Sequence, residues 1–304
     1  MVRHSPLALL LDYDGTLVPF APQPELAAPG PALLDLLASV APLPGTLTAV
    51  VSGRPRADLE RWFGDTPHLW LAAEHGAFLR GEGAWTSPWP GRSDAVRELC
   101  DVLEPLASRV VGALVEPKVC TVAFHYRGVE SSKKAELLAD VDGAIQAWLR
   151  ENDGYAAIAG AEVVEVRPAA ARKSAAVDWV RRSHGSDLWI VALGDDLTDE
   201  DMFGALGSSD EAVIVGRDFD RVTAATWGLD GPEHTAQFLR WLIAVRQDAP
   251  TAAPSRIPRR IRPEPATGGE RGDHALLVIS NRLPDLRGPV APDEVGRGRV
   301  GGLV

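Results

Sequence analysis

Two aspartates one residue apart are the first candidates for chemistry. In the segment LLLDYDGTLVPF, residues 9–20, an apolar run leads directly into Asp12 and Asp14, with a glycine and a threonine after them. Side chains two positions apart on an extended segment point to one face, so these carboxylates repel each other unless a cation or a shared proton lies between them. Mg²⁺ prefers such oxygen ligands, and paired carboxylates can also act as nucleophile and proton donor. A strand-end turn with helix-capping aspartates is the alternative interpretation.

A second acidic group follows another apolar segment. ALGDDLTDEDMF, residues 192–203, carries acidic side chains at 195, 196, 199, 200 and 201. The macrodipole of a helix favours acids in its first turn, which accounts for those from Asp199 onward. Asp195 and Asp196 precede the predicted helix and adjoin the strand end, so we predict that they are metal ligands.

A serine and a lysine complete the candidate catalytic set. Ser52 follows the apolar segment TLTAVV, and its hydroxyl and nearby backbone N–H groups suit a phosphate oxygen. Serine before glycine is also common in ordinary turns. Lys173, in RPAAARKSAAV, lies near a predicted helix start, where it can neutralise a phosphoryl group or simply be a solvated lysine.

The elements that must position these residues alternate between strand and helix. Apolar segments predict strands over 7–11, 46–51, 69–73, 188–193 and 212–215, and helical spacing predicts helices over 31–40, from about 172, after 199 and over 234–245. Such alternation is typical of an α/β fold with a doubly wound parallel sheet, which binds ligands at the carboxyl ends of its strands. The candidate residues follow those strand ends.

The middle of the chain has a different pattern. A helix is predicted over 94–111, a strand over 119–126, a second helix over 133–150, and one or two strands over 155–166. This block predicts a smaller α+β domain inserted into the α/β domain. We therefore divide the chain into a core (1–90 and 169–247), an inserted domain (91–168), a linker rich in Pro, Ala, Gly and Arg (248–273), and a last segment (274–304).

Length and composition limit the possible partners. The 304 residues are enough for roughly two domains, and the net charge of −11 argues against nucleic acid or an anionic membrane as a partner. The two cysteines, Cys100 and Cys120, predict no disulfide framework and fit a reducing cytoplasm. No apolar run approaches the ~20 residues that span a bilayer, and the N-terminus lacks the pattern of a signal peptide. We expect a cytoplasmic protein.

The four motifs DYDGT, SGR, a lysine and GDDxTDED occur in order, so residues 7–216 resemble the haloacid-dehalogenase superfamily of phosphotransferases. The resemblance implies that Asp12 is a nucleophile forming an aspartyl-phosphate. Asp14 is then the general acid for the leaving alcohol and the base for water, while Ser52 and Lys173 hold the phosphoryl group. The cofactor implied is Mg²⁺, and the candidate metal residues are Asp12, Asp14, Asp195, Asp196 and Asp199.

The position of the inserted domain, between Ser52 and Lys173, marks a C2-type cap in this superfamily, a mobile lid that reads the leaving group. Its polar residues lie in EPKVCTVAFHYRG (116–128) and VVEVRP (163–168), opposite AAEHGAFLR (72–80) of the core. Carboxylates mixed with cationic donors suit sugar hydroxyls. A solvated strand face with cross-strand ion pairs is the alternative interpretation.

The segments EHGAFLR, E-x-K…HYR and EVRP resemble the trehalose-6-phosphate phosphatases. The resemblance implies that Glu116, Lys118, Arg127 and Glu165 bind the sugar hydroxyls. The full set of candidate substrate-binding residues is Gly53, Arg54, Glu74, His75, Gly76, Glu116, Lys118, His125, Arg127 and Glu165. The family usually has Asn or Asp before the motif lysine and Gly after it, whereas this chain has Arg172 and Ser174. That departure puts local substrate contacts in doubt but leaves the lysine in place.

The last segment carries LLVISNRLP followed by GRVGGLV, which resembles the start of a retaining glycosyltransferase of the trehalose-phosphate synthase family. We therefore expect a fragment or truncated product of a phosphatase–synthase fusion, with a fused or associated glycosyltransferase as partner. Bifunctional glucosylglycerol-phosphate synthase/phosphatases resemble this arrangement too, so their substrate is a rival to trehalose 6-phosphate. A catalytically silent domain that regulates a fused synthase is the third hypothesis.

Overall fold

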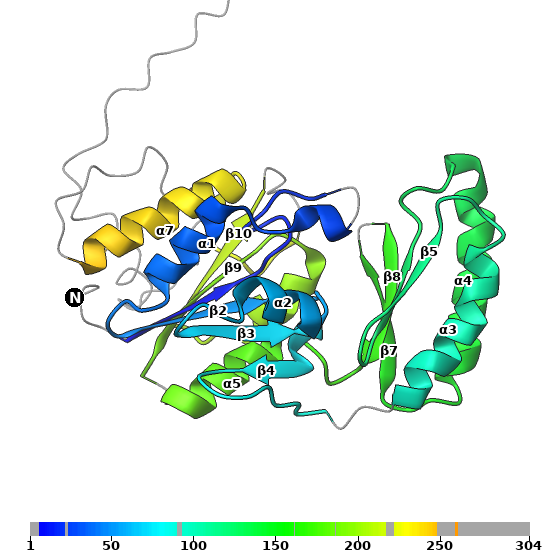
Figure 1. Ribbon diagram of the computed structural model, residues 1–304, viewed down its shortest axis with the longest axis horizontal. Coiled ribbons are helices and arrows are strands. Elements are labelled where there is room, and N and C mark those ends of the chain that lie inside the picture. Colours follow the sequence, from blue (N-terminus) through cyan, green and yellow to red (C-terminus); the bar gives the residue numbers. More distant parts are fainter. Residues whose placement is uncertain are drawn as a thin grey trace, which may run out of the picture.

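The computed structural model describes residues 6–21, 24–89, 93–160, 162–185, 187–216, 222–247 and 259–260. They form two β-sheets flanked by helices, a larger one of eight strands and a smaller one of four (Figure 1). The predicted last segment, 274–304, and the predicted linker apart from Arg259–Arg260 lie outside the described residues.

The larger sheet contains the chemistry-bearing strand ends. Its strands are β1 (Leu7–Leu11), β2 (Thr46–Val51), β3 (Leu69–Ala73), β4 (Phe78–Arg80), β9 (Trp189–Gly194), β10 (Glu211–Val215), β11 (Trp227–Leu229) and β12 (Arg259–Arg260). They lie in the order β12-β11-β10-β9-β1-β2-β3-β4, and all neighbours are parallel except at the two edges, where β4 and β12 run antiparallel. β1 lies between β2 and β9 and every one of its residues is buried, as expected for an apolar run covered on both faces.

Helices cover both faces of this sheet. Alternate residues of β1 face opposite sides: Leu9 packs with the cluster that contains α1 (Pro31–Val40), α2 (Arg56–Phe63) and α7 (Pro232–Arg246). Leu10 packs with the cluster that contains α5 (Ser174–His184) and α6 (Glu200–Gly204). Figure 1 shows α1 and α7 together above the sheet and α5 below it. Three short 3₁₀ turns complete this part: η1 (Pro24–Ala27), η2 (Glu74–Gly76) and η3 (Leu197–Asp199).

The smaller sheet forms what we call the cap unit. It contains β5 (Leu114–Pro117), β6 (Val122–His125), β7 (Tyr155–Gly160), β8 (Val163–Pro168), α3 (Ser93–Ala107) and α4 (Ser131–Leu149). The strand order is β5-β6-β8-β7, and every pair is antiparallel. Both helices pack on one face, the side away from the larger sheet in Figure 1, around a cluster that includes Phe124 and Val141. The opposite face of this four-stranded sheet is not covered by α3 or α4, and it faces the larger sheet.

The predicted fold class, a doubly wound parallel sheet with a smaller α+β insertion, is confirmed. The limits proposed for the core and the inserted domain stay predictions. Two expected elements were wrong in extent. The helix over 94–111 ends at Ala107, beyond which i→i−3 turn bonds such as Val110 N–H to Ala107 O replace the helical ones. The strand over 119–126 is shorter because Lys118 N–H bonds Thr121 O in a turn that joins β6 to the unpredicted β5.

None of the helices among the described residues is both long enough and apolar enough to cross a membrane.

Candidate active site

Three adjacent strands deliver the central polar residues to one edge of the larger sheet. Leu11 of β1 is in register with Val50 of β2 and Leu193 of β9, so the next residues along each strand emerge side by side. These include Asp12, Ser52 and Asp195. The strand order changes direction at β1, which is where open α/β sheets bind ligands. The sequence therefore places a hydroxyl and two carboxylates beside β1, where the strand order changes direction.

Gly15 allows the first acidic segment to meet the second. Its φ is +82°, and a Cβ at this position would lie 2.2 Å from Oδ2 of Asp195. No side chain fits there. The neighbouring Thr16 hydroxyl donates a hydrogen bond to Asp195 Oδ1 at 3.3 Å. The DxDGT pattern thus encodes the close approach of β1 and β9 side chains as well as the two acids.

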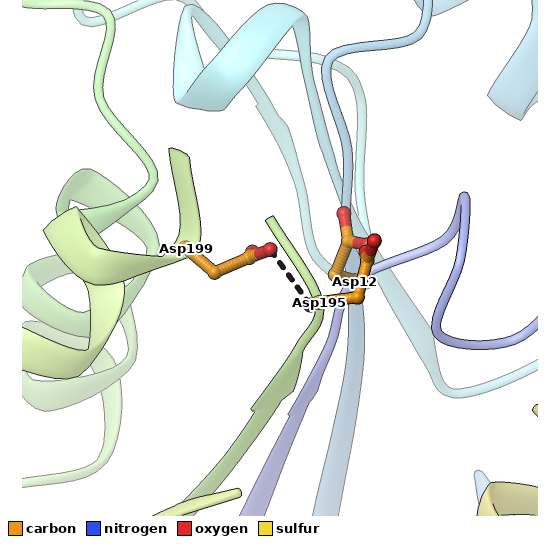
Figure 2. Close-up of side chains that lie close together, drawn as sticks. All are labelled: Asp12, Asp195 and Asp199. Atoms are coloured by element: carbon orange, nitrogen blue, oxygen red, sulfur yellow. Dashed lines mark hydrogen bonds between the residues drawn. The ribbon is translucent and has the colours of Figure 1, made fainter. Parts of the chain in front are cut away.

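Asp12, Asp195 and Asp199 form a compact carboxylate cluster. One oxygen from each lies within 4.8 Å of the others, and Figure 2 shows the Asp12 and Asp195 side chains close together with Asp199 directed at the Asp195 backbone. Asp199 accepts hydrogen bonds from the backbone N–H groups of Asp195 and Asp196 at 3.1 and 3.0 Å. These bonds hold the acidic loop against the end of β9.

Lys173, directly before α5, is the cation of this cluster. Its Nζ donates to Asp12 Oδ1 at 2.6 Å and to Asp199 Oδ1 at 2.7 Å, and its side chain is buried. Burial works to lower the pKa of Lys173, but the attraction of Asp12 and Asp199 outweighs it and the net shift is upward. The lysine is therefore charged, and it is not a merely solvated residue.

The cluster holds more negative charge than Lys173 can balance. Burial raises the pKa of Asp12 to about 7, with repulsion from Asp199 adding to the effect. Burial and then repulsion from Asp12 raise the pKa of Asp195 to about 10. Both shifts express the cost of placing ionised carboxylates together in a buried site. A divalent cation with oxygen ligands relieves this repulsion, so the residues present fit Mg²⁺.

Asp14 lies outside the carboxylate cluster and has a different partner. Arg54 forms a two-bond ion pair with it, Nε to Oδ2 at 2.8 Å and Nη2 to Oδ1 at 2.6 Å. The guanidinium carbon also lies 5.9 Å from the Tyr13 ring centroid and 5.5 Å from that of Trp62. Rings and carboxylate together orient Arg54, and Arg54 in turn holds Asp14 at the mouth of the site.

A cleft of about 750 Å³ lies between these strand ends and the open face of the cap unit. Most of the predicted site residues line it: Asp12, Asp14, Ser52, Gly53, Arg54, His75, Glu116, Lys118, His125, Arg127, Glu165, Lys173, Asp195 and Asp196. The strand register of the cap unit explains this convergence. Glu116 and Glu165 both align with Ala123 on β6, so the two carboxylates share the cleft-facing side of the sheet.

Polar contacts join the core and cap sides of the cleft. Lys118 Nζ donates to the carbonyl oxygen of Gly53 at 2.9 Å and to Glu165 Oε1 at 2.8 Å. His75 Nε2 lies 2.8 Å from Glu165 Oε2. Burial works to raise the pKa of Glu165, but Lys118 and then His75 outweigh it and hold that pKa well below its usual range. Burial lowers the pKa of His75 despite Glu165, so the imidazole is neutral at pH 7 and donates through Nε2.

The chain is similar to known proteins in sequence and in fold. The model of the trehalose-phosphatase family matches residues 10–232. The chain belongs to the trehalose-phosphatase family. It is 40% identical over 209 residues to a protein of Thermoproteus tenax named bifunctional trehalose-6-phosphate synthase/phosphatase, covering 68% of this chain and 28% of that relative. The chain thus spans less than a third of that relative's length.

Solved structures agree with this family. The C-terminal domain of the C. albicans trehalose-6-phosphate phosphatase is 27% identical with a TM-score of 0.70, covering 79% of this chain and 94% of that one. A haloacid dehalogenase-like hydrolase from Bacteroides thetaiotaomicron, 12% identical with a TM-score of 0.57 over 78% of this chain and 99% of that one, shares the fold. The trehalose-phosphatase match covers both the acidic strand ends and the cap unit.

Two predicted metal ligands do not belong to the carboxylate cluster. Asp14 is paired with Arg54, as described above. Asp196 caps η3, where its Oδ1 accepts the Leu197 N–H at 2.6 Å. The sequence prediction rested on the position of Asp196 at a strand end, before the helix, and on the resemblance for Asp14. Their roles as metal ligands stay predictions, and their side chains make these other hydrogen bonds in the structure.

Three predicted site residues do not line the cleft. Asp199 is buried behind Lys173, with both carboxylate oxygens already hydrogen-bonded. Glu74 is fully buried and bonds the 119–120 backbone, and a Cβ on Gly76 would lie 2.7 Å from the Arg172 carbonyl oxygen. Glu74 and Gly76 therefore cannot touch a sugar in this arrangement. The binding roles predicted for these two residues stay predictions, and the structure places neither of them on the cleft.

Arg127 is at the rim of the cleft. Its Nη1 donates to the Ala21 carbonyl oxygen at 3.2 Å, which joins the cap unit to the loop after Asp14.

Apolar residues of the cleft were missed from sequence. Phe20, Leu114 and Ile158 line it, and the first two expose 56% and 52% of their surface. Period-two alternation is the signal that could have found the strand residues, because Leu114 precedes Glu116 by two positions and Ile158 pairs with Glu165. An exposed apolar side chain beside polar donors suits the mixed surface of a sugar ring.

Proposed function

We propose that this chain is a Mg²⁺-dependent phosphatase that hydrolyses trehalose 6-phosphate to trehalose and phosphate. The observation that carries the proposal is the cluster of Asp12 and Asp195, at the ends of β1 and β9, with Lys173, facing a cleft whose other wall is the polar face of the cap unit. Membership of the trehalose-phosphatase family supports the substrate, and the relatives' names point the same way.

The proposed reaction begins at Asp12. One of its carboxylate oxygens attacks phosphorus, the P–O bond to the sugar breaks, and an aspartyl-phosphate forms. Lys173 already donates to Asp12 Oδ1 and is placed to bond a phosphoryl oxygen beside it. Ser52, at the end of β2, lines the same cleft and offers its hydroxyl to another phosphoryl oxygen. Mg²⁺ bound by Asp12 and Asp195 would neutralise charge on the phosphoryl group.

Asp14 is the proposed proton carrier. It lies at the mouth of the site, between the nucleophile and the cap unit, and lines the cleft. It donates a proton to the leaving sugar oxygen and then accepts one from the water that hydrolyses the aspartyl-phosphate. Its ion pair with Arg54 engages both carboxylate oxygens, so substrate binding must loosen that pair before the acid step. Asp199 positions Lys173 and the acidic loop without touching substrate.

The cap unit supplies the proposed recognition of the sugar. Glu116, Lys118 and Glu165 present carboxylate oxygens and an ammonium group to the cleft, which together pair with hydroxyls acting as donors or acceptors. Glu116 already accepts from His125 at 2.8 Å. Arg127 would close the outer rim. We further propose that a glycosyltransferase domain accompanies the phosphatase, on the strength of residues 274–304 and of the bifunctional Thermoproteus tenax relative.

The test is phosphate release with Mg²⁺ from a panel of trehalose 6-phosphate, glucosylglycerol phosphate, sucrose 6-phosphate and glucose 6-phosphate, with D12N as the blank. We expect trehalose 6-phosphate to be preferred, and D12N to lose about 10⁴-fold in rate while remaining folded. Preference for glucosylglycerol phosphate would keep the catalytic assignment and change the substrate. A folded protein that binds Mg²⁺ and releases phosphate from none of the four would favour a regulatory domain.

A further inference from the structure

Glu74 is a buried core carboxylate whose side-chain hydrogen bonds, within the part of the chain that the structure describes, all come from the cap unit. It follows β3 directly and is fully inaccessible to solvent. Its Oε1 accepts the Val119 N–H at 3.2 Å, and its Oε2 accepts the Cys120 N–H at 3.0 Å and the Cys120 thiol at 3.3 Å. A buried carboxylate is costly unless it is hydrogen-bonded, so these contacts couple Glu74 strongly to the tip of the β5–β6 hairpin.

The hairpin tip is inserted into the core. Cys120 is only 2% exposed, and its side chain packs in the hydrophobic cluster of the larger sheet together with Leu71 and Ala73. The residues on either side of the tip, in β5 and β6, pack instead with α3 and α4. Residues 118–121 therefore form the part of the cap unit that contacts the floor of the cleft.

The backbone that carries Glu74 is strained. Glu74 has φ +47° and His75 has φ +57°, both in the left-handed region that non-glycine residues rarely adopt. Such strain persists only where the surroundings require it, and it gathers at sites where a side chain must point in one direction. Here the two consecutive residues reach different parts of the cap unit, because Glu74 bonds the hairpin tip and His75 bonds Glu165.

The same tip carries Lys118. Its backbone N–H bonds Thr121 O within the turn at 2.8 Å, and its ammonium bridges Gly53 O and Glu165 in the cleft. The position of Lys118 therefore depends on where residues 119 and 120 are held.

We propose that Glu74 is a positioning residue that docks the β5–β6 hairpin onto the core and thereby sets Lys118 in the cleft. The proposal rests on the proposed function for its effect on substrate. If the hairpin leaves the core, the carboxylate loses every hydrogen bond shown for it here. These hydrogen bonds favour the docked hairpin over the undocked one. Binding of substrates that are recognised through Lys118 depends on the docked hairpin. A small ester that needs only the Asp12 chemistry does not.

The test uses E74Q, which keeps the shape but replaces one acceptor oxygen with an NH₂ donor, so one backbone N–H loses its acceptor and the other keeps only a neutral one. We expect KM for trehalose 6-phosphate to rise about tenfold, as for weakening a charge-assisted hydrogen bond, with kcat changed less. Hydrolysis of p-nitrophenyl phosphate, which offers no sugar hydroxyls, should stay within about twofold. Equal losses on both esters would show a general structural role and overturn the proposal.

Cys120 provides a readout that needs no turnover. In a C100A background, labelling of the Cys120 thiol by an aromatic disulfide reports undocking of the tip, because the thiol is buried when docked. We expect E74Q to label about tenfold faster than its parent. Unchanged labelling would contradict docking by Glu74. If the wild-type chain fails on trehalose 6-phosphate, the proposed function fails while this labelling still decides the role of Glu74.

A matched control is D210N. The Asp210 side chain is also fully buried and accepts backbone N–H groups, from Ile190 at 2.9 Å and Gly207 at 2.7 Å, but it lies away from the cap unit. We expect a lowered melting temperature with no change in the ratio of the two ester activities. If E74Q does not fold, hydrogen exchange at the Val119 and Cys120 amides of the unaltered protein decides. Slow exchange supports docking, and exchange as fast as in a free turn refutes it.

Discussion

The core side and the cap side of the cleft treat charge in opposite ways. On the core side, the carboxylates of Asp12, Asp195 and Asp199 share one lysine, and the excess negative charge raises pKa values. On the cap side each acid has its own partner, Glu165 with Lys118 and Glu116 with His125. The core cluster therefore has excess negative charge that a cation would offset, whereas each of these cap acids already has a hydrogen-bonded partner.

This difference separates two tasks. A buried acidic cluster with excess negative charge binds a cation strongly, because the cation relieves the repulsion that the fold imposes, and the cation and Lys173 can then hold an anionic phosphoryl group. A polar surface whose acids already have partners exchanges its hydrogen bonds for those of neutral hydroxyls. Under the proposed function, the core carries out the chemical step and the cap unit recognises the leaving group.

The largest effect is expected from D195N, which removes one of the three carboxylates from the core cluster. Loss of this ligand should lower phosphate release about 10³-fold on trehalose 6-phosphate and on p-nitrophenyl phosphate alike, because both need the same phosphoryl stabilisation. The rise in melting temperature on adding Mg²⁺ should also vanish.

D196N is the matched control for that variant. Asp196 adjoins Asp195 but caps η3, so D196N should keep the response to Mg²⁺ and lose less than about tenfold in rate. Equal losses in the two variants would show that the acidic loop acts as a whole. The proposal that Asp195, and not Asp196, is the metal ligand from this loop would then fail.

A smaller effect is expected from E165Q, on the cap side of the cleft. KM for trehalose 6-phosphate should rise about tenfold, since one charged acceptor is lost, while p-nitrophenyl phosphate hydrolysis changes little. E162Q is the control, because Glu162 lines the outer cleft but pairs with Lys134 rather than Lys118. A uniform loss on both esters in E165Q would mean that the cap unit takes part in the chemical step.

The smallest effect concerns pH and stability. The groups facing His75 are Glu165, Lys118 and Arg167, and burial lowers the pKa of His75 below its usual value of 6.5. Between that lowered value and 6.5 the unfolded chain binds more protons, so stability is lost as the pH falls through this window. Glu165, whose pKa is also lowered, adds a loss of the same sign at still lower pH.

The measurement is urea unfolding of the wild type and H75Q between pH 5 and 7.5 with Mg²⁺ present. H75Q should flatten the decline toward acid pH relative to the wild type. Parallel pH profiles for the two proteins would show that His75 does not cause the loss of stability at acid pH. The contact of His75 with Glu165 would then couple the cap unit to the core less tightly than the structure indicates.

Parts of the molecule followed directly from the sequence. The strands at 7–11 and 46–51 and the helix at 31–40 have their predicted bounds, because apolar spacing within one segment is a local property. The parallel sheet then brought Asp12, Ser52 and Asp195 to one edge. Their roles in catalysis stay predictions. The extents of the helix from Ser93 and of the β5–β6 hairpin were wrong because turn hydrogen bonds ended them.

Glu74 and His75 mark the limit of sequence reasoning. They are adjacent in the chain, carry polar side chains and were both predicted to contact substrate. The structure sends His75 to the cleft and Glu74 into the core, against a hairpin tip some 45 residues away in sequence. No local pattern distinguishes these two outcomes, because the partner of each side chain belongs to a distant segment.

The sequence by itself determined the fold class, the acids at the strand ends and the inserted α+β unit, since each depends on residue type and short-range spacing. The tertiary structure alone decided how those acids divide. Asp12, Asp195 and Asp199 meet around Lys173, Asp14 pairs with Arg54, and Asp196 caps a turn. The physical reason is that charge balance is settled among groups that only folding brings within a few ångströms of one another.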